Sequence, residues 1–237
     1  MTLAIAHTDP AALIARCDSA GARTARGKPE YKNGAVLPVG PWQPLTAALA
    51  AELRPTEQSD STLVELVKLP DGPPPATLAT LANRLGDPDA VHLGQATSPA
   101  KALTTTPNHQ DGRRIGLHID NWDRLHYQAK NTGRRRLCFN LGPGTRYLLL
   151  GSLDIRAVCR ALHTDPEDRF PHTDDLRAYT ALGLPLRVFR LRLDPGEGYI
   201  APTELLPHDG STEGQPQPST ATFWLGHWPR GVLASLI

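Results

Sequence analysis

The sequence predicts an α+β fold in which a mostly helical N-terminal part, residues 1–110, precedes an antiparallel barrel or sandwich over residues 111–237. Helix start and stop signals dominate the first hundred residues, whereas short apolar runs bounded by glycine and proline dominate the remainder. The 23 prolines and 20 glycines are spread along the chain and favour many short elements. Because there is no internal repeat and no clear boundary, we expect residues 1–237 to form a single domain.

Helices and one strand are expected in the N-terminal part. Asp9 and Pro10 supply an N-cap and a proline at the first helical position for the segment AALIARC. Residues 45–53 and 76–85 also have helical patterns, and a glycine follows the second. Between them, the run STLVELVKL over residues 61–69 has the apolar and β-branched content of a strand.

Short strands around a helical insert are expected in the C-terminal part. The strands are expected over residues 115–120, 135–141, 146–150, 186–193, 198–201 and 220–226. The helical insert covers residues 152–183: Ser152 can cap LDIRAVCRAL, and Thr173 with two aspartates can cap LRAYTAL, which stops at Gly183. The stretch 208–218, rich in proline, glycine and glutamine, is predicted to be a mobile loop and a candidate lid.

The composition argues against several classes of partner. A formal net charge of +1 creates no field that attracts nucleic acid or an anionic membrane. No segment approaches the roughly 20 apolar residues of a transmembrane helix, and the N-terminus has no signal-peptide pattern. The three cysteines, Cys17, Cys138 and Cys159, form no CxxC pair, which favours reduced thiols. We therefore expect a cytoplasmic protein that acts on a small molecule, without nucleic-acid or membrane partners.

The stretch GLHIDNW, residues 116–122, carries the most specific chemical signal. His118 and Asp120 are two residues apart on an expected strand, so their side chains point to the same face and can bind one metal ion. Two histidines and one carboxylate that leave one side of the metal open are the ligands of non-haem Fe(II) oxygenases. A His–Asp hydrogen bond at a strand end is the alternative interpretation.

A third ligand is expected on a later strand that returns to the same end of the barrel. His208 follows a tight glycine turn, a short strand and a proline-containing turn in PGEGYIAPTELLPHDGS, which is the layout by which a cupin-type barrel returns a ligand to its metal. The histidines of the helical insert are expected at the surface. His227, at the end of the last strand, is the next candidate.

From about Gly116 to Pro229, the chain resembles the Fe(II)/2-oxoglutarate-dependent oxygenase superfamily, and most closely its aspartyl/asparaginyl β-hydroxylase-like branch. The resemblance rests on His118-x-Asp120, RRRLCFNLGPGTRYLLL (residues 134–150), His208 and the closing TATFWLGHWP. It implies a double-stranded β-helix, a cupin-like jelly roll, with flanking N-terminal helices and a helical insert. It also implies a single-domain non-haem dioxygenase of the hydroxylase type that uses Fe(II), 2-oxoglutarate and O2. The first hundred residues are outside the resemblance.

The resemblance implies candidate residues for the cosubstrate. Most members place an arginine after the distal histidine to bind the far carboxylate of 2-oxoglutarate, but here Thr220 or a neighbour occupies that position. Because a buried carboxylate without a cationic partner is costly, another base must bind it. Arg136 is the first choice, since alternation places it on the same strand face as Asn140, which is expected to face the cosubstrate unless it caps a turn. Arg146, on the next strand, is the second.

The loop after the HxD motif is expected at the mouth of the site. Trp122 is a candidate to contact the substrate, and Asp123 and Arg124 are candidates to bind an amino-acid-like zwitterion. We expect hydroxylation of an amino acid or an amino-acid-derived small molecule, because Asp120 occupies the position that related halogenases vacate for chloride. Two alternatives stay open: a cupin-like metalloenzyme that needs no 2-oxoglutarate, and a degenerate β-helix domain that only binds a partner.

Overall fold

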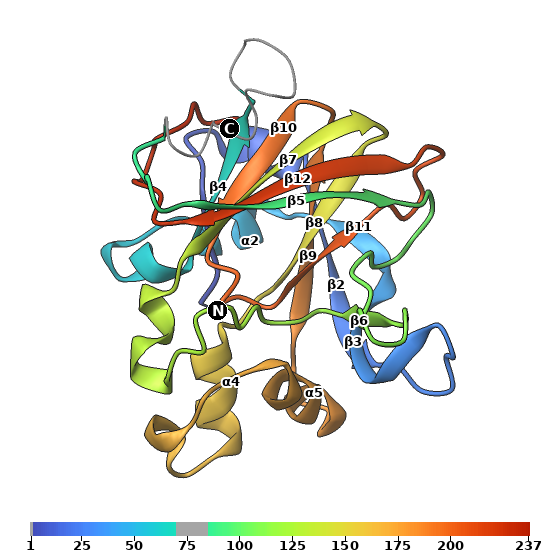
Figure 1. Ribbon diagram of the computed structural model, residues 1–237, viewed down its shortest axis with the longest axis vertical. Helices are drawn as coiled ribbons and strands as arrows, with labels where there is room; N and C mark the ends of the chain where they lie inside the picture. Colours follow the sequence, from blue (N-terminus) through green and yellow to red (C-terminus); the bar gives the residue numbers. More distant parts are fainter. Residues whose placement is uncertain (1, 70–84) are drawn as a thin grey trace.

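Two six-stranded β-sheets face each other in the computed structural model, which describes residues 2–69 and 85–237 (Figure 1). In order across the sheet, sheet A contains β1 (Ala4–Ala6), β4 (Leu63–Lys68), β10 (Glu197–Ala201), β7 (Arg135–Pro143), β12 (Ser219–Gly226) and β5 (Val91–Ser98). Sheet B contains β11 (His208–Ser211), β8 (Arg146–Gly151), β9 (Arg187–Leu193), β2 (Cys17–Thr24), β3 (Tyr31–Pro44) and β6 (Arg114–Gly116). Neighbouring strands are antiparallel, apart from the parallel pairs β1–β4 and β3–β6.

From β5 onward the chain passes repeatedly from one sheet to the other. β5, β7, β10 and β12 belong to sheet A, whereas β6, β8, β9 and β11 belong to sheet B. As a result, β12 pairs with both β5 and β7, and β11 pairs with β8, so the last strands lie beside the first ones of this half (Figure 1). An isolated antiparallel bridge between His118 and His208 adds the segment after β6 to the same end of sheet B.

Strand alternation divides the core into the space between the sheets and their outer faces. Leu148, Leu150 and Phe189 of sheet B belong to the cluster between the sheets, together with Cys138 and Tyr199 of sheet A. The residues of opposite parity form separate clusters on the outer faces: Leu149 and Val188 on sheet B, and Leu137 and Phe139 on sheet A.

Helices cover part of these outer faces. The described helices are α1 (Pro10–Ile14), α2 (Ala47–Glu52), α4 (Ile155–Leu162) and α5 (Thr173–Ala181), with the 3-10 helices η1 (Glu57–Thr62), η3 (Tyr127–Thr132) and η4 (Pro166–Asp168). α4 and α5 lie together at the lower end of the molecule in Figure 1 and pack against the outer face of sheet B. The N-cap of α4 is Asp154 rather than the predicted Ser152, and the N-cap of α5 is His172 rather than Thr173. Gly183 follows α5 with a positive φ of 74°, as its predicted stop requires.

The prediction of a mostly helical N-terminal part is wrong. The two short helices α1 and α2 form where they were predicted, and Asp9 caps α1. The strands β1 to β5, however, account for most of the regular secondary structure described in this part, and β2 and β3 continue sheet B beyond β9. Residues 17–44 contain many small, glycine and proline residues and little clear alternation. The pairing of β2 with β9, and of β3 with β2, therefore stabilises strands that local signals do not indicate. The predicted helix 76–85 lies, apart from its last residue, outside the described residues.

The predicted strands of the C-terminal part are largely confirmed. β7, β8, β9, β10 and β12 match their predicted ranges within two residues, and β4 confirms the predicted N-terminal strand. The predicted strand 115–120 is shorter, because β6 ends at Gly116.

The predicted mobile loop over residues 208–218 is an ordered part of the fold and not a lid. Its first residues form β11, and Thr212 is buried, with a hydroxyl group that donates to the carbonyl oxygen of Pro99 at 2.6 Å. The side-chain amide of Gln215 donates to the hydroxyl group of Tyr147 at 2.7 Å. These contacts bind the stretch to β8 and to the segment after β5.

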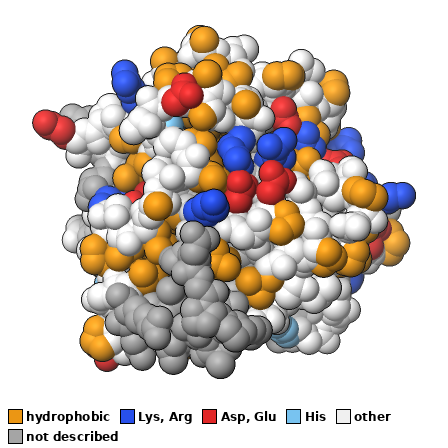
Figure 2. Space-filling model, turned by 90° about the horizontal axis from the view of Figure 1, so that it is seen from above, with side chains coloured by type: hydrophobic (Ala, Val, Ile, Leu, Met, Phe, Trp, Pro, Cys, Tyr) orange, Lys and Arg blue, Asp and Glu red, His pale blue; other side chains and the backbone are white. Residues whose placement is uncertain are grey.

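The charges of the molecule are intermixed. On the face seen in Figure 2, acidic and basic side chains lie next to one another instead of gathering by sign. Around the β9–β10 turn, Arg16 pairs with Glu197, and Arg192 pairs with Asp194. This distribution agrees with the near-neutral composition. Among the residues described by the structure, no helix is long and apolar enough to cross a membrane.

Candidate metal centre

His118, Asp120 and His208 meet at one end of the space between the sheets. His118 follows β6 and His208 begins β11, and each donates its backbone N–H to the carbonyl oxygen of the other, at 3.0 and 2.9 Å. The backbone N–H of Asp120 donates to the carbonyl oxygen of Thr203 at 3.0 Å. All three side chains are buried, and one ligand atom of each lies within 4.8 Å of the others. The structure therefore brings together the three residues predicted as ligands.

Both histidines present the same ring nitrogen to this centre. Nδ1 of His118 lies 2.9 Å from the carbonyl oxygen of Gly116, and Nδ1 of His208 lies 3.1 Å from that of Leu206. Because a carbonyl oxygen only accepts, each Nδ1 carries a proton, and in a neutral ring Nε2 then presents its lone pair to the centre. The two Nε2 atoms face different oxygens of Asp120, at 4.0 Å for His118 and 3.7 Å for His208. A backbone acceptor behind the ring is typical of metal-ligating histidines.

One buried polar atom at the centre lacks a hydrogen-bond partner. Within the described part of the chain, Nε2 of His208 has no hydrogen bond, whereas Oδ2 of Asp120 is paired with the Arg136 guanidinium. Leaving a buried polar group unsatisfied costs about 1–3 kcal/mol, so the bare Nε2 calls for an explanation. A divalent cation bound between the three side chains would satisfy it, and two imidazole nitrogens with one carboxylate suit a transition metal. The residues therefore fit a metal ion.

The charges around the centre favour the protonation states that ligands need. Burial opposes ionisation of Asp120, but the nearby Arg136, His208 and His118 more than offset this, so its pKa lies below the usual value. Burial lowers the pKa of His208 to about 3, in spite of the opposing effect of the Asp120 carboxylate. Asp120 is thus ionised and His208 neutral near pH 7, as metal binding requires.

Arg136 forms an ion pair with Asp120, one of the candidate ligands. Its Nη2 lies 2.6 Å from Oδ2 of Asp120, and its guanidinium lies 5.6 Å from the centre of the Phe223 ring. The side chain is on the inner face of β7, as alternation predicted. Because it already pairs with Asp120, Arg136 is poorly placed to be the main anchor of a cosubstrate carboxylate.

Arg146 is the buried cation that lacks such a pair. It is 5% exposed, forms no ion pair with an acidic residue among those described, and its Nη1 has no hydrogen-bond partner there. It lies at the start of β8, on the inner face with Leu148. Its Nη2 passes so close to Gly210 that a Cβ atom added there would lie only 2.5 Å away. Gly210 follows His208 by two residues and lies on the same face of β11. The Arg146 guanidinium is therefore next to the strand that carries His208.

Cys138 and Tyr199 line the interior near both arginines. They are direct partners on β7 and β10, and both are buried. Burial raises the pKa of each, that of Tyr199 far above its usual value, so both groups are neutral near pH 7. The charges of Arg136 and Arg146 act on both, which places the two guanidiniums in one interior space. The sequence analysis missed Tyr199, although alternation in EGYIA would have indicated its inward position.

Asn140 has a structural role, and its predicted contact with a cosubstrate is wrong. Its Nδ2 donates to the carbonyl oxygens of Gly144 and Leu193, both at 3.0 Å. Its Oδ1 accepts from the N–H of Gly142 at 2.9 Å and from the hydroxyl of Ser219 at 2.8 Å. These contacts use both donors and both acceptor positions of the amide. Asn140 therefore binds the β7–β8 turn to the neighbouring strands, which was the alternative considered for it.

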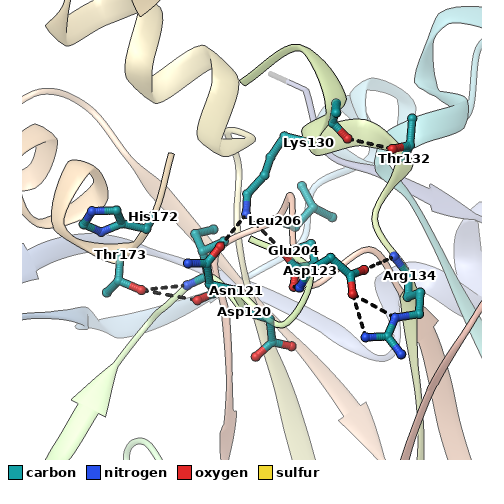
Figure 3. A network of polar contacts seen from close by, with 12 residues as sticks. Asp120, Asn121, Asp123, Lys130, Thr132, Arg134, His172, Thr173, Glu204 and Leu206 are labelled. Carbon is teal, nitrogen blue, oxygen red and sulfur yellow. Dashed lines mark hydrogen bonds and ion pairs between the residues drawn. The ribbon is translucent and has the colours of Figure 1, made fainter. Parts of the chain in front are cut away.

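A buried ion pair supports the loop that follows Asp120. Nζ of Lys130 lies 2.9 Å from Oε2 of Glu204 and 3.3 Å from Oδ1 of Asn121, and the paired side chains are 0% and 1% exposed. Figure 3 shows the Lys130 side chain reaching toward Asn121 and Glu204, while the carboxylate of Asp120 points away from them. The remaining oxygen of Glu204 accepts from the N–H of Asp123 at 3.1 Å.

This ion pair connects both chain segments that hold Asp120. Asn121 directly follows Asp120, and Glu204 directly follows Thr203, whose carbonyl oxygen accepts from the Asp120 N–H. Lys130 thus supports the backbone around Asp120, one residue of the candidate centre. Nothing local in the sequence indicates a pair between residues 74 positions apart.

The three predicted substrate residues have different surroundings. Oδ1 of Asp123 accepts hydrogen bonds from Nη2 of Arg134 at 2.6 Å and from Nε of Arg134 at 2.9 Å (Figure 3). The charge of the Asp123 carboxylate is therefore already neutralised by Arg134. Trp122 is 54% exposed, and Arg124 is exposed with a positive φ of 48°. Trp122 and Arg124 therefore stay candidates for substrate contact, whereas Asp123 orders the loop between them and β7.

The interpretation of the site rests on its geometry, because the chain matches no protein-family model and no curated protein is significantly similar to it. Among the described residues, the features that bear on function are thus the buried His–Asp–His group, the Arg136–Asp120 pair beside it and Arg146, which pairs with no acidic residue there.

Proposed function

We propose that the protein is a non-haem Fe(II)- and 2-oxoglutarate-dependent oxygenase built on a double-stranded β-helix. The passage of β5 to β12 between two facing antiparallel sheets, with the first and last strands side by side, supports this fold. The observation that carries the function is the pairing of two features in one interior space. His118, Asp120 and His208 converge with Nε2 of His208 unsatisfied, and Arg146 is buried without an acidic partner among the described residues.

In this proposal, His118 and His208 would hold Fe(II) through Nε2, and Asp120 would hold it through a carboxylate oxygen. With 2-oxoglutarate and O2, the bound metal would supply the oxidation of an unreactive C–H bond, which no protein side chain can perform. Arg136 holds the carboxylate of Asp120 in orientation, and the Gly116 and Leu206 carbonyl oxygens hold the two imidazole rings.

Arg146 is assigned the far carboxylate of 2-oxoglutarate. A guanidinium donates two parallel hydrogen bonds to a carboxylate, and in a buried site this pairing removes the cost of both unpaired charges. This assignment reverses the order of preference from the sequence, because Arg136 already pairs with Asp120. The neutral Tyr199 hydroxyl lies in the same interior, beside Cys138.

The substrate is proposed to be an amino acid or an amino-acid-derived small molecule, bound at the rim that carries Trp122 and Arg124. An exposed aromatic ring and an unburied guanidinium suit a small ligand with an apolar part and a carboxylate. Because Asp120 is available as a metal ligand, hydroxylation is the proposed outcome, without chlorination even at high chloride concentration.

Anaerobic reconstitution tests the proposal. Metal-free protein is loaded with Fe(II) and then with 2-oxoglutarate; we expect the visible charge-transfer absorption of the bound 2-oxoacid, and succinate after O2 is admitted. Arg146→Met should lose the absorption at a cosubstrate concentration that saturates the parent protein. Arg190→Met is the matched control, since Arg190 lies on the outer face of sheet B between Trp42 and Tyr147.

The same measurement separates the two alternatives. Metal binding without absorption or succinate would indicate a metalloenzyme that needs no 2-oxoglutarate. Failure to bind Fe(II) or Mn(II) would indicate a binding domain. The Arg136–Asp120 pair favours that second alternative, because it neutralises the carboxylate without a metal.

A further inference from the structure

A second group of metal-binding side chains lies outside the candidate centre, between α4 and α5. Cys159 and His163 are four residues apart at the end of α4, and Asp175 is in the first turn of α5. Their ligand atoms lie within 4.8 Å of one another, and Nε2 of His163 is 3.0 Å from Oδ1 of Asp175. Cys159 and Asp175 are buried, whereas the His163 side chain is 28% exposed.

We propose that Cys159, His163 and Asp175 form a second metal site, for zinc, that joins α4 to α5. Thiolate, imidazole and carboxylate are the three donor types that Zn²⁺ takes in proteins. Cys159 is in the last turns of α4, and His163 is the C-cap residue of α4, with an extended backbone. The exposed part of His163 leaves room for a water molecule as the fourth ligand. On binding, Zn²⁺ replaces the thiol proton of Cys159, which passes to solvent.

In the metal-free protein, the guanidinium of Arg169 contacts the Asp175 carboxylate that a bound metal ion would contact. Its Nη2 lies 3.3 Å from Oδ1 of Asp175, the same oxygen that faces His163. The Arg169 side chain is 43% exposed, so it can move into solvent when a metal replaces it. The second oxygen of Asp175 accepts from the N–H of His172 at 3.1 Å, which holds the carboxylate in place for a ligand. Zinc and Arg169 therefore compete for one carboxylate oxygen.

The site would connect the helical insert to the candidate centre. The hydroxyl of Thr173, the first residue of α5, accepts from the N–H of Ile119 at 3.1 Å, and Ile119 lies between His118 and Asp120. Zinc at Asp175 would fix the start of α5 and, through Thr173, the segment that carries the two ligands. The second site does not depend on the proposed oxygenase activity, since its ligands are separate.

Titration of the chelator-stripped full-length protein with Co²⁺, a spectroscopic substitute for Zn²⁺, tests the site. We expect a thiolate-to-cobalt absorption in the near ultraviolet that Zn²⁺ removes on addition. Only the second site contains sulfur, so His118, Asp120 and His208 cannot give this signal. The band should be absent in Cys159→Ser and present in Cys17→Ser, because Cys17 is a buried thiol outside the group. A folded parent protein without the band, or a band that persists in Cys159→Ser, overturns the proposal.

Zinc affinity measured against a chromophoric chelator gives the second arm. It is measured in a His118→Ala background, so that the candidate centre does not contribute, with circular dichroism to verify folding. His163→Gln, a change at a partly exposed position, should weaken zinc binding by about tenfold or more. Arg169→Gln should strengthen it, because the competing cation is gone. Unchanged affinity in both variants would show that the group is a hydrogen-bonded contact between the helices and would also overturn the proposal.

Discussion

Two buried groups of charged side chains lie on opposite sides of the Asp120 backbone, and they differ in how their polar atoms are satisfied. In the Lys130–Glu204 group, the ammonium has two oxygen partners and the carboxylate accepts from both the ammonium and a backbone N–H. In the His118–Asp120–His208 group, Arg136 pairs with Oδ2 of Asp120, but Nε2 of His208 lacks a hydrogen bond among the described residues.

This difference indicates different roles. A satisfied buried ion pair stabilises one arrangement of the chain, whereas unsatisfied buried atoms at a point of convergence indicate a missing ligand. Since Lys130 and Glu204 support the backbone of Asp120, the first group is the support of the second. The two groups should therefore respond differently to substitution.

The largest expected effect is loss of the metal. His118→Ala, Asp120→Ala and His208→Ala should each remove Fe(II) binding and abolish activity while the fold survives, because three protein ligands are needed to hold the ion. Metal content by mass spectrometry and thermal unfolding of the metal-free variants measure the two parts. A fully active His208→Ala variant would place the third ligand elsewhere, with His227 the next to test.

A large loss of stability is expected in the other group. Lys130→Met should lower the free energy of unfolding by about 3–5 kcal/mol, the usual effect of leaving one buried charge unpaired. The double variant Lys130→Met, Glu204→Leu should recover part of the loss, because neither charge is then left. Arg177→Met, which breaks the exposed pair with Asp174, is the control and should cost less than about 1 kcal/mol. Denaturant titration measures the free energy of unfolding of all three variants. Equal losses in the three would contradict the difference between the two buried groups.

An intermediate effect is expected on the cosubstrate. Arg146→Met should weaken 2-oxoglutarate binding by about 2–5 kcal/mol, the usual cost of removing one partner of a desolvated charge pair. Metal affinity should be nearly unchanged, since Arg146 does not contact the ligands. Calorimetric titration of the Mn(II)-loaded protein provides the measurement. An unchanged affinity, with a large loss in Arg136→Met, would return the role to Arg136.

The smallest effect is expected at Gly210. An alanine Cβ there would lie 2.5 Å from Nη2 of Arg146 and 2.5 Å from the hydroxyl oxygen of Thr105, so both must shift. Overpacking of this kind costs about 1–3 kcal/mol, and here the displaced guanidinium should reduce 2-oxoglutarate affinity more than stability. Comparison of calorimetry with unfolding for Gly210→Ala checks this. Equal cosubstrate affinity in parent and variant would argue that Arg146 does not bind the carboxylate.

The strands that the sequence predicts correctly have a strong local pattern. RRLCFNL, RYLLL and RVFRLRL combine β-branched, apolar and aromatic residues between turns, and they form β7, β8 and β9. The segments over residues 17–44 lack such a pattern. They become strands because β2 pairs with β9 and β3 pairs with β2, which local analysis cannot detect. Local analysis also missed the strand His208–Ser211, because a short strand among glycine and proline residues resembles a loop.

The sequence by itself determined the chemical types at the candidate centre. An HxD pair on one face and a later histidine after a turn were enough to select His118, Asp120 and His208, because strand alternation is a local rule. Tertiary structure alone decided the charge partners: Arg136 on Asp120, Arg134 on Asp123, Lys130 on Glu204 and none among the described acidic residues on Arg146. These pairings depend on which strands and loops come within a few ångströms in space. An arginine has the same charge everywhere in the sequence, but only the folded chain determines whether a carboxylate already neutralises it.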